Sequence, residues 1–313
     1  MSDALVPTAP AEARPPARPS GRRRGTPRAS ERRTAWAMVA PTILVVLAVA
    51  LLPIADTVWL SLHQASVTET GAFVGLDNFK FIFSDPAFTE ALKNTAIFTV
   101  VSVAIELVLG LGIALVLNQH FRGRGAIRAI VLIPWAFPLS VAAVLGRLML
   151  QDQVGILSYI AHGLGLAHGP ILSDPNSLLV SVILVDVWTS VPFMALLLLA
   201  GLQTIPGEVI EAARVDGASA AQRLFRITLP LLWPAILLAL LFRTLQAWAV
   251  YDLFYVMAQR QLESLSTYVY QGVRVSELNF APGTAAAVFT FLTSLAIVVL
   301  FIRGFGARTA GEV

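Results

Sequence analysis

The stretch IEAARVDGASAAQRLFRITLP, residues 210–230, decides the fold, because it is a polar, charged segment between two long apolar stretches. Of the 313 residues, 57% are hydrophobic and only 13% are charged, whereas soluble domains carry roughly 25% charged residues. The composition therefore indicates a membrane protein. The quoted segment is expected to be a loop that joins two membrane spans.

Six stretches of mostly apolar residues are long enough to cross a hydrocarbon core of about 30 Å. They cover residues 35–62, 94–117, 126–150, 178–202, 231–257 and 284–302. Prolines inside them predict kinks, which neighbouring helices accommodate by pairing the freed carbonyl groups. These prolines are Pro41, Pro53, Pro134, Pro138, Pro192 and Pro234. We therefore expect an all-α, polytopic membrane protein with six transmembrane helices over residues 34–307.

The two ends of the chain are predicted to be cytoplasmic tails. Residues 1–33 are rich in Pro, Ala and Arg and bury little, so they predict a disordered tail, and residues 308–313 form a short second one. A cleaved signal peptide is the alternative, but the apolar stretch behind the tail is longer than a signal core of about 7 to 15 residues. With both termini in the cytoplasm, 16 of the 22 Lys and Arg residues lie on that side and four lie outside. This bias favours the orientation and places the loop 205–230 in the cytoplasm.

The loop is predicted to begin with a short helix. Pro206 suits a first helical turn, because its missing N–H would be unpaired there anyway. Glu208 and Glu211 then place negative charge near the helix N-terminus, where it is favourable. Gly217 can take the left-handed conformation that ends helices.

A second short helix is predicted directly after Gly217. Ser219 and Gln222 have the spacing of a capping box, and Pro230 bounds the helix before the fifth span. In the first helix, the small side chains of Ala212 and Ala213 let another surface approach the backbone closely. These features predict a docking site for another protein. The alternative is an amphipathic helix that rests on the inner leaflet.

The loop pattern resembles the EAA loop of permease subunits of bacterial ATP-binding cassette (ABC) importers. The segments FVGLDNFKFIFSDPAFTEALKNT (73–95) and FRTLQAWAVYDLFYVM (242–257) are similar to the branch that imports sugars of the maltose, trehalose and glycerol-phosphate type. The resemblance covers residues 35–305 and implies the type I ABC importer permease fold, in which the loop helix inserts into a cleft of a separate ATPase. The coupling residues implied by the resemblance are Glu211, Ala212, Ala213, Asp216, Gly217, Leu229 and Pro230.

The resemblance implies a permease subunit of a sugar importer in the bacterial inner membrane, working by alternating access. The implied partners are two ABC ATPase subunits, a second permease that is a different chain, an extracytoplasmic sugar-binding protein and membrane lipid. ATP and Mg would be bound by the ATPase subunits. The substrate would be a disaccharide such as trehalose or maltose. Relatives often carry a Gly-rich segment where this chain has residues 258–270, so the particular sugar stays open.

The sequence gives no sign of enzyme, metal or nucleic-acid chemistry. A phosphate-binding loop needs a lysine after glycine, but Lys80 and Lys93, the two lysines of the chain, follow Phe and Leu. There is no cysteine, and the four histidines are scattered, so we expect no metal site and no catalytic residue. Eight arginines in the first 33 residues account for the basic charge, and no folded basic stripe follows them.

Ionisable side chains inside the apolar stretches are costly to place in a membrane and are therefore candidate functional groups. In the fifth stretch an aromatic face lies beside a carboxylate, which suits a sugar, because sugar C–H faces pack on rings and sugar hydroxyls donate to oxygen. Tyr255 completes that face, but we interpret it as part of an interfacial aromatic belt. The predicted substrate-pathway residues are Asp186, Thr189, Arg243, Gln246, Trp248, Tyr251 and Asp252.

Two alternatives to this pathway stay open. Arg243 and Gln246 lie on a different face of the fifth stretch, and a structural pair with Asp186 or Glu106 on neighbouring spans fits them equally well. A different function, an ion-coupled carrier or channel, would use Asp186 and Asp252 as relay groups. That function leaves the EAA pattern unexplained.

Overall fold

The computed structural model describes residues 29–66, 68–275 and 280–309. The chain divides into two compact units, Met1–Pro53 and Ile54–Val313. Helix α1 (Ala29–Val46) and a π-helical turn, η1 (Leu47–Leu51), belong to the first unit, and the chain continues into α2 (Leu52–Ser61), most of which belongs to the second unit. Helix α1 begins inside the segment predicted as a disordered tail, and residues 1–28 of that tail lie outside the described residues.

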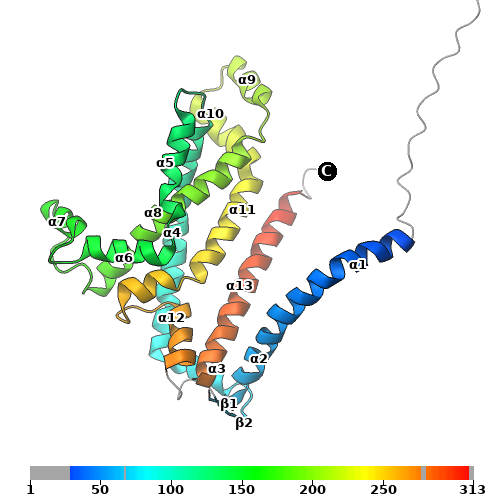
Figure 1. Cartoon of the computed structure of the whole chain (residues 1–313). Helices are drawn as coiled ribbons and strands as arrows, with labels where there is room; N and C mark the ends of the chain where they lie inside the picture. The colour runs from blue at the N-terminus through cyan, green and yellow to red at the C-terminus, as the bar shows by residue number, and fades with distance from the viewer. Residues whose placement is uncertain (1–28, 67, 276–279, 310–313) are drawn as a thin grey trace, which may run out of the picture. The chain divides into compact units, whose positions relative to one another are not determined.

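The second unit holds a short hairpin and the remaining helices (Figure 1). The hairpin pairs β1 (His63–Ala65) with β2 (Thr70–Phe73) in antiparallel fashion, and the apolar pattern did not predict it. The helices are α3 (Asp77–Ser84), α4 (Pro86–Asn118), α5 (Arg124–Ala136), α6 (Leu139–Leu150), α7 (Ile156–Gly163), α8 (Pro175–Leu202), α9 (Gly207–Val215), α10 (Ala220–Arg223), α11 (Leu229–Trp248), α12 (Leu265–Tyr270) and α13 (Phe280–Thr309), with π-helical turns η2 (Leu224–Thr228), η3 (Phe254–Ala258) and η4 (Gln271–Val275).

Two long helices, α4 and α8, begin with the same aspartate N-cap followed by a proline. The side chain of Asp85 accepts a hydrogen bond from the N–H of Ala87 at the start of α4, and Asp174 accepts one from Ser177 at the start of α8. In both helices a proline occupies the first turn, where its missing N–H costs nothing. The backbone hydrogen bond from Ser177 lowers the pKa of Asp174, so the cap is ionised at neutral pH.

The core of the second unit lies where α4, α8 and α11 pack together. A Cβ atom on Gly110 of α4 would lie 2.7 Å from Cγ of Met194 on α8. A Cβ atom on Gly201 of α8 would lie 2.4 Å from Cβ of Ala235 on α11. Both approaches therefore require glycine, as expected for helices that pack closely in a membrane.

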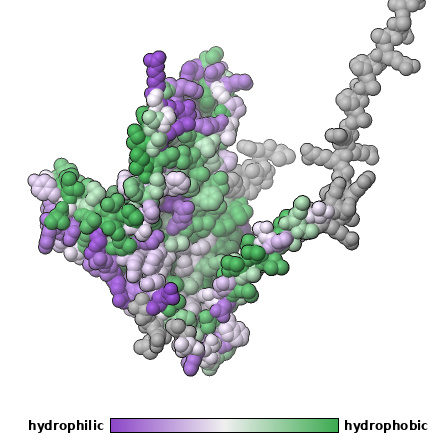
Figure 2. All heavy atoms as spheres, viewed as in Figure 1, coloured by the Kyte–Doolittle hydropathy of each residue, from purple (hydrophilic) through white to green (hydrophobic). Residues whose placement is uncertain are grey.

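Among the described residues, five helical segments are long and apolar enough to cross a membrane, and α5 with α6 makes a sixth if the pair is counted as one span. The axes of α5 and α6 differ by 88°, so the kink predicted for the third apolar stretch is a sharp bend that divides the stretch into two helices. The helix breaks at Phe137 and Pro138, because proline lacks an N–H and disfavours helical geometry in the residue before it. In Figure 2, hydrophilic residues gather at the α9 end and at the opposite end, with apolar residues between them.

The fifth apolar stretch also differs from the prediction, because α11 ends at Trp248 instead of continuing to residue 257. The chain is not helical at Val250 and Tyr251 and becomes helical again just before η3. The hydroxyl of Ser264 donates to the carbonyl of Val250 at 2.8 Å, which replaces a helical bond at the break. Trp248 and Tyr251 are therefore not on one continuous helical face, contrary to the prediction.

Candidate functional site

The loop between α8 and α11 folds as the predicted helix and turn. Pro206 lies immediately before the first residue of α9, and Glu208 lies in the first turn. Gly217 follows the end of α9 with φ of +80°, the left-handed conformation predicted for it. Nothing lies within 4 Å of a Cβ built on Gly217, so the backbone angle, and not crowding, requires glycine there.

The second helix of the loop begins as predicted but does not end at Pro230. Ser219 and Gln222 form the capping box, with both reciprocal hydrogen bonds present. Helix α10, η2 and α11 then run as one helix from Ala220 to Trp248, so the predicted boundary at Pro230 is wrong. The π-helical turn explains this continuity, because the N–H of Leu229 bonds to Leu224, five residues back, and the shifted ladder accommodates the missing N–H of proline.

Most of the predicted coupling residues lie on the surface of this loop. Glu211, Ala212, Asp216, Gly217 and Pro230 are exposed, Leu229 is half-buried, and Ala213 is 9% exposed. Apolar side chains lie exposed on the same loop, at Val209, Val215 and Phe225. Exposed apolar side chains among charged ones are consistent with a surface that binds another protein.

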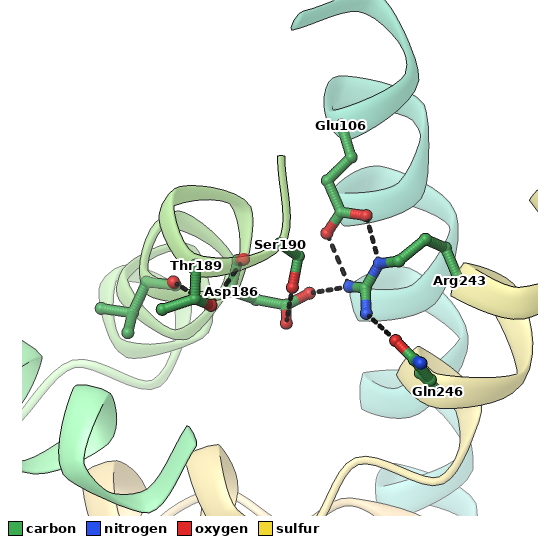
Figure 3. A network of polar contacts seen from close by, with 7 residues as sticks. Glu106, Asp186, Thr189, Ser190, Arg243 and Gln246 are labelled. Carbon is green, nitrogen blue, oxygen red and sulfur yellow. Dashed lines mark hydrogen bonds and ion pairs between the residues drawn. The ribbon is translucent and has the colours of Figure 1, made fainter. Parts of the chain in front are cut away.

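A buried ion cluster joins α4, α8 and α11 (Figure 3). Arg243 of α11 donates from Nε to Oε2 of Glu106 at 2.6 Å and from Nη2 to Oε1 of Glu106 at 2.7 Å. The same Nη2 donates to Oδ2 of Asp186 on α8 at 3.1 Å. The exposed fractions are 0% for Glu106, 3% for Asp186 and 4% for Arg243, so all three side chains lie out of contact with the surroundings.

Neighbouring polar groups complete the cluster. The Oγ of Ser190 donates to Oδ1 of Asp186 at 3.4 Å, and Nη1 of Arg243 donates to Oε1 of Gln246 at 2.8 Å. Gln246 is exposed, whereas the hydroxyl of buried Thr189 is bonded to backbone carbonyls of its own helix. Of the two interpretations of Arg243, the structural pair matches these contacts, and substrate contact stays a prediction.

A second cluster, of three tyrosine rings, lies beyond the end of α11. The ring of Tyr251 stacks on Tyr255 with centroids 5.1 Å apart and contacts Tyr270 at 5.3 Å. Tyr255 and Tyr270 are 5.5 Å apart. Partial burial, and then the neighbouring Tyr270 and Tyr255, raise the pKa of Tyr251 to about 12, so its hydroxyl is neutral at pH 7. Asp252, adjacent in sequence, is half-buried.

Trp248 is separate from this tyrosine cluster. Its indole Nε1 donates to Oγ1 of Thr293 on α13 at 2.9 Å, and the ring packs with a smaller apolar cluster that includes Phe88 and Leu265. Tyr255 packs against Tyr251 and is 48% exposed, and its place in an interfacial belt stays a prediction. The predicted aromatic face is therefore replaced by a different grouping, in which Tyr270 takes the place of Trp248.

The turn after η3 has an unusual backbone. Gln259 and Arg260 have φ of +46° and +71°, and among the described residues they are the only non-glycine positions in the left-handed region. Arg147 of α6 donates to the carbonyl of Met257 at 2.5 Å and to Oε1 of Gln259 at 2.7 Å. Arg260 donates to Gln271 at 2.7 Å. Side-chain contacts therefore hold a turn that glycine would adopt without strain.

Comparison with known proteins assigns the family. The profile described as "Binding-protein-dependent transport system inner membrane component" matches residues 106–310. The chain belongs to this family. It is 37% identical over 278 residues to the trehalose/maltose transport system permease protein MalF of Thermococcus litoralis, covering 87% of this chain and 94% of the relative. It is 38% identical over 288 residues to the trehalose transport system permease protein SugA of Mycobacterium tuberculosis, with 91% and 92% covered.

Solved structures support the same assignment at the level of fold. A chain of the bacterial alginate ABC transporter, crystallised with its alginate pentasaccharide-bound periplasmic protein, superposes with a TM-score of 0.74 at 24% identity. The match covers 87% of this permease and 93% of the alginate chain. This permease therefore has the type I ABC importer fold, as the loop pattern implied.

Three residues of this permease that shape the two clusters or the turn after η3 were missed or only partly identified. Tyr270 lies in α12, outside every apolar stretch, so helical spacing gave no signal for it. Arg147 was not among the candidates, although it anchors the turn at Gln259. Ser190 shares a helical face with Asp186, and that spacing is the signal that relates it to the ion cluster.

Proposed function

We propose that the chain is a permease subunit of an ABC sugar importer, in which α9 is the helix gripped by a separate ATPase. The observation that carries the proposal is the folded loop between α8 and α11, whose Glu211 and Ala212 are exposed beside apolar side chains. The named relatives support the sugar class, since two of them are permeases for trehalose or maltose. We assign trehalose or maltose as the substrate.

The proposed mechanism is alternating access between this chain and a second, different permease, with two ATPase subunits and an external binding protein. We place both termini and α9 in the cytoplasm, following the distribution of Lys and Arg. An ATPase that binds α9 can shift the equilibrium between two conformations of the permease only by the difference between its binding free energies for them. Reversing a 1:99 population requires a difference of about 5.5 kcal/mol. The capped, left-handed junction at Gly217 gives α9 the rigidity that such a handle needs.

The proposed sugar contacts are Tyr251 and Asp252. Tyr251 offers a ring face and a neutral hydroxyl, and the half-buried carboxylate of Asp252 accepts hydrogen bonds from sugar hydroxyls. We assign the other predicted pathway residues to structure. Asp186, Thr189, Arg243 and Gln246 hold or flank the ion cluster, and Trp248 braces α13.

The coupling role is tested by Glu211→Arg in cells that depend on this chain for sugar uptake. We expect uptake to be abolished while the protein stays in the membrane, because a cation replaces the exposed carboxylate of the docking helix. Glu69→Arg, the same charge change on the exposed hairpin loop, is the matched control and should retain uptake. Purification of the parent chain should also bring down an ATPase.

The ion-coupled carrier makes the opposite predictions. Uptake that survives Glu211→Arg, or that persists in ATP-depleted cells under a proton gradient, would favour a carrier that uses Asp186 and Asp252 as relay groups. Loss of uptake in the Glu69→Arg control would show that charge reversal as such disturbs the protein. Measuring membrane-inserted protein in each strain separates a folding defect from a coupling defect.

The substrate contact is tested at Tyr251. We expect Tyr251→Ala to lower trehalose or maltose uptake about tenfold, because one ring face and its hydroxyl are worth about 1.4 kcal/mol together. Tyr251→Phe keeps the ring and should retain most of the uptake. Equal losses in Tyr251→Ala and Tyr251→Phe would place the contribution in the hydroxyl, and no loss in either would remove this residue from the pathway.

A further inference from the structure

We propose that Arg243, with Glu106 and Asp186, is the joint that makes α4, α8 and α11 move as one body with the α9 loop. This inference rests on the proposed function, because it concerns how the movement of α9 reaches the rest of the permease. The three residues are positioning residues, since they lie within the protein and act through the helices that carry them.

The two helices that flank the loop each carry one residue of this joint. Helix α8 leads into α9 and carries Asp186, while α11 leaves the loop and carries Arg243. Asp186 lies 16 residues before the end of α8, and Arg243 lies 14 residues after the start of α11. At 1.5 Å per residue these positions are about 24 and 21 Å along the helices from the loop. The ion cluster therefore joins the two arms of the loop about 20 Å away from the loop itself.

A second contact joins the same two helices close to the loop. Gly201 of α8 lies against Ala235 of α11, where a Cβ atom would approach to 2.4 Å. A single contact allows one helix to rotate about the other, whereas two contacts that lie far apart along the axis do not. A push on α9 is therefore expected to move α8 and α11 together.

Glu106 extends the body to α4. It is held at both carboxylate oxygens by Arg243, and α4 also packs closely on α8 where Gly110 meets Met194. Farther along α4, Asn94 donates to the carbonyl of Glu263 at 3.2 Å, and Thr95 accepts from the N–H of Leu265 at 2.9 Å.

These contacts connect α9 to the segment that carries the tyrosine cluster. Residues 249–270 follow α11, and Asn94 and Thr95 attach that segment to α4. The body thus has the α9 loop at one end and the tyrosines at the other, with the ion cluster between them. Movement at the loop reaches the proposed sugar contacts without any change inside the body.

The chemistry of arginine favours a joint that stays closed. The guanidinium is planar and offers its donors in fixed directions, so its paired bonds to Glu106 tolerate little sliding of α4 against α11. Opening the cluster would leave charges unpaired in a buried site, which is costly. A lysine would keep the charge but, as a single flexible ammonium, would let the helices slide.

That difference supplies the first test, Arg243→Lys, in the full transporter reconstituted in proteoliposomes with its ATPase subunits and binding protein. We expect the complex to assemble and to hydrolyse ATP at its basal rate, while sugar transported per ATP falls about tenfold, within the range of allosteric coupling energies. Transport per ATP equal to the parent would overturn the proposal. If the parent chain itself assembles with no ATPase, the proposed function fails and not the joint.

The second test uses the absence of cysteine from the sequence. In Gly110→Cys/Met194→Cys the two Cβ positions lie 3.0 Å apart, close to the disulfide range of about 3.5–4.5 Å. If α4 and α8 stay together throughout the cycle, the oxidised transporter should transport as fast as the reduced one. The reduced double variant is the control for the substitutions, because Gly110→Cys alone would place its Cβ 2.7 Å from Cγ of Met194. Loss of transport on oxidation, restored by reductant, would show that the helices separate and would refute the joint.

Discussion

At the scale of single residues, the charge balance of the ion cluster decides how each substitution acts. Two carboxylates, Glu106 and Asp186, share one guanidinium, and the third donor nitrogen of Arg243 is taken by Gln246. Removing one acid leaves the other acid paired with Arg243. Neutralising Arg243 leaves two acids facing each other in a buried site.

We therefore expect Arg243→Gln to be much more harmful than Asp186→Asn. Removing one partner of a buried ion pair costs about 3–5 kcal/mol, so Arg243→Gln should lower the thermal unfolding temperature of the detergent-purified protein strongly. Asp186→Asn keeps the shape of the side chain and should change it little. Similar unfolding temperatures for the two variants would contradict this charge balance.

The sequence identified all three charges of the cluster but could not pair them. Helical spacing tells which residues share a face of one helix, as it did for Arg243 and Gln246. It does not tell how that helix is rotated against its neighbours. The choice between a substrate contact and a structural pair for Arg243 therefore needed the packing of α4, α8 and α11.

At the scale of elements, the turn after η3 stores strain that the surrounding side chains hold in place. Non-glycine residues in the left-handed region cost about 1–2 kcal/mol each, and Gln259 and Arg260 are consecutive. The bonds from Arg147 to Met257 and Gln259 offset part of this cost.

We expect Gln259→Gly/Arg260→Gly to raise the stability of the protein by about 1 kcal/mol, because the strain relieved at two residues exceeds the loss of the side-chain hydrogen bonds of Gln259 and Arg260. Arg147→Ala alone should destabilise it, since two hydrogen bonds are lost. In the glycine background the cost of Arg147→Ala should shrink, because one of the two acceptors of Arg147 is already absent and the turn is no longer strained. A double-mutant cycle of unfolding free energies measures this coupling, and strict additivity would disprove it.

The junction between α9 and α10 gives a second prediction at this scale. Gly217→Val forces a β-branched residue into φ of +80° and should abolish copurification of the ATPase. Gly217→Asn is the matched control, because asparagine tolerates that conformation, and it should retain binding. Since a Cβ at this position meets nothing within 4 Å, equal effects of the two variants would exclude backbone conformation as the cause.

The sequence predicted those elements whose ends are set by neighbouring residues, and it failed where a distant residue sets the end. Capping at Ser219 and the left-handed glycine are set by neighbouring residues, and the sequence predicted them correctly. The end of α11 depends on the hydroxyl of Ser264, which is distant in sequence, and could not be predicted. The expected helix end at Pro230 was wrong because a π-helical turn accommodates the proline.

At the scale of the whole molecule, the orientation of the permease in the membrane can be measured directly. The chain has no cysteine, so Val215→Cys on α9 and Glu69→Cys on the hairpin loop each provide one thiol, both at exposed positions. A maleimide that cannot cross the membrane should label Glu69→Cys in intact cells, and should label Val215→Cys only after the cells are broken. The reverse pattern would invert the proposed topology.

The bend between α5 and α6 has a consequence for the surrounding lipid. Helix α5 has 13 residues, so it is about 20 Å long, which is shorter than the hydrocarbon core of about 30 Å. Beyond Phe137 the chain turns aside by 88°, and no straight helix continues α5 to match the full acyl length. We therefore expect the bilayer beside this helix pair to thin, at a cost that grows with acyl length. We therefore expect the transport rate to depend on the thickness of the bilayer.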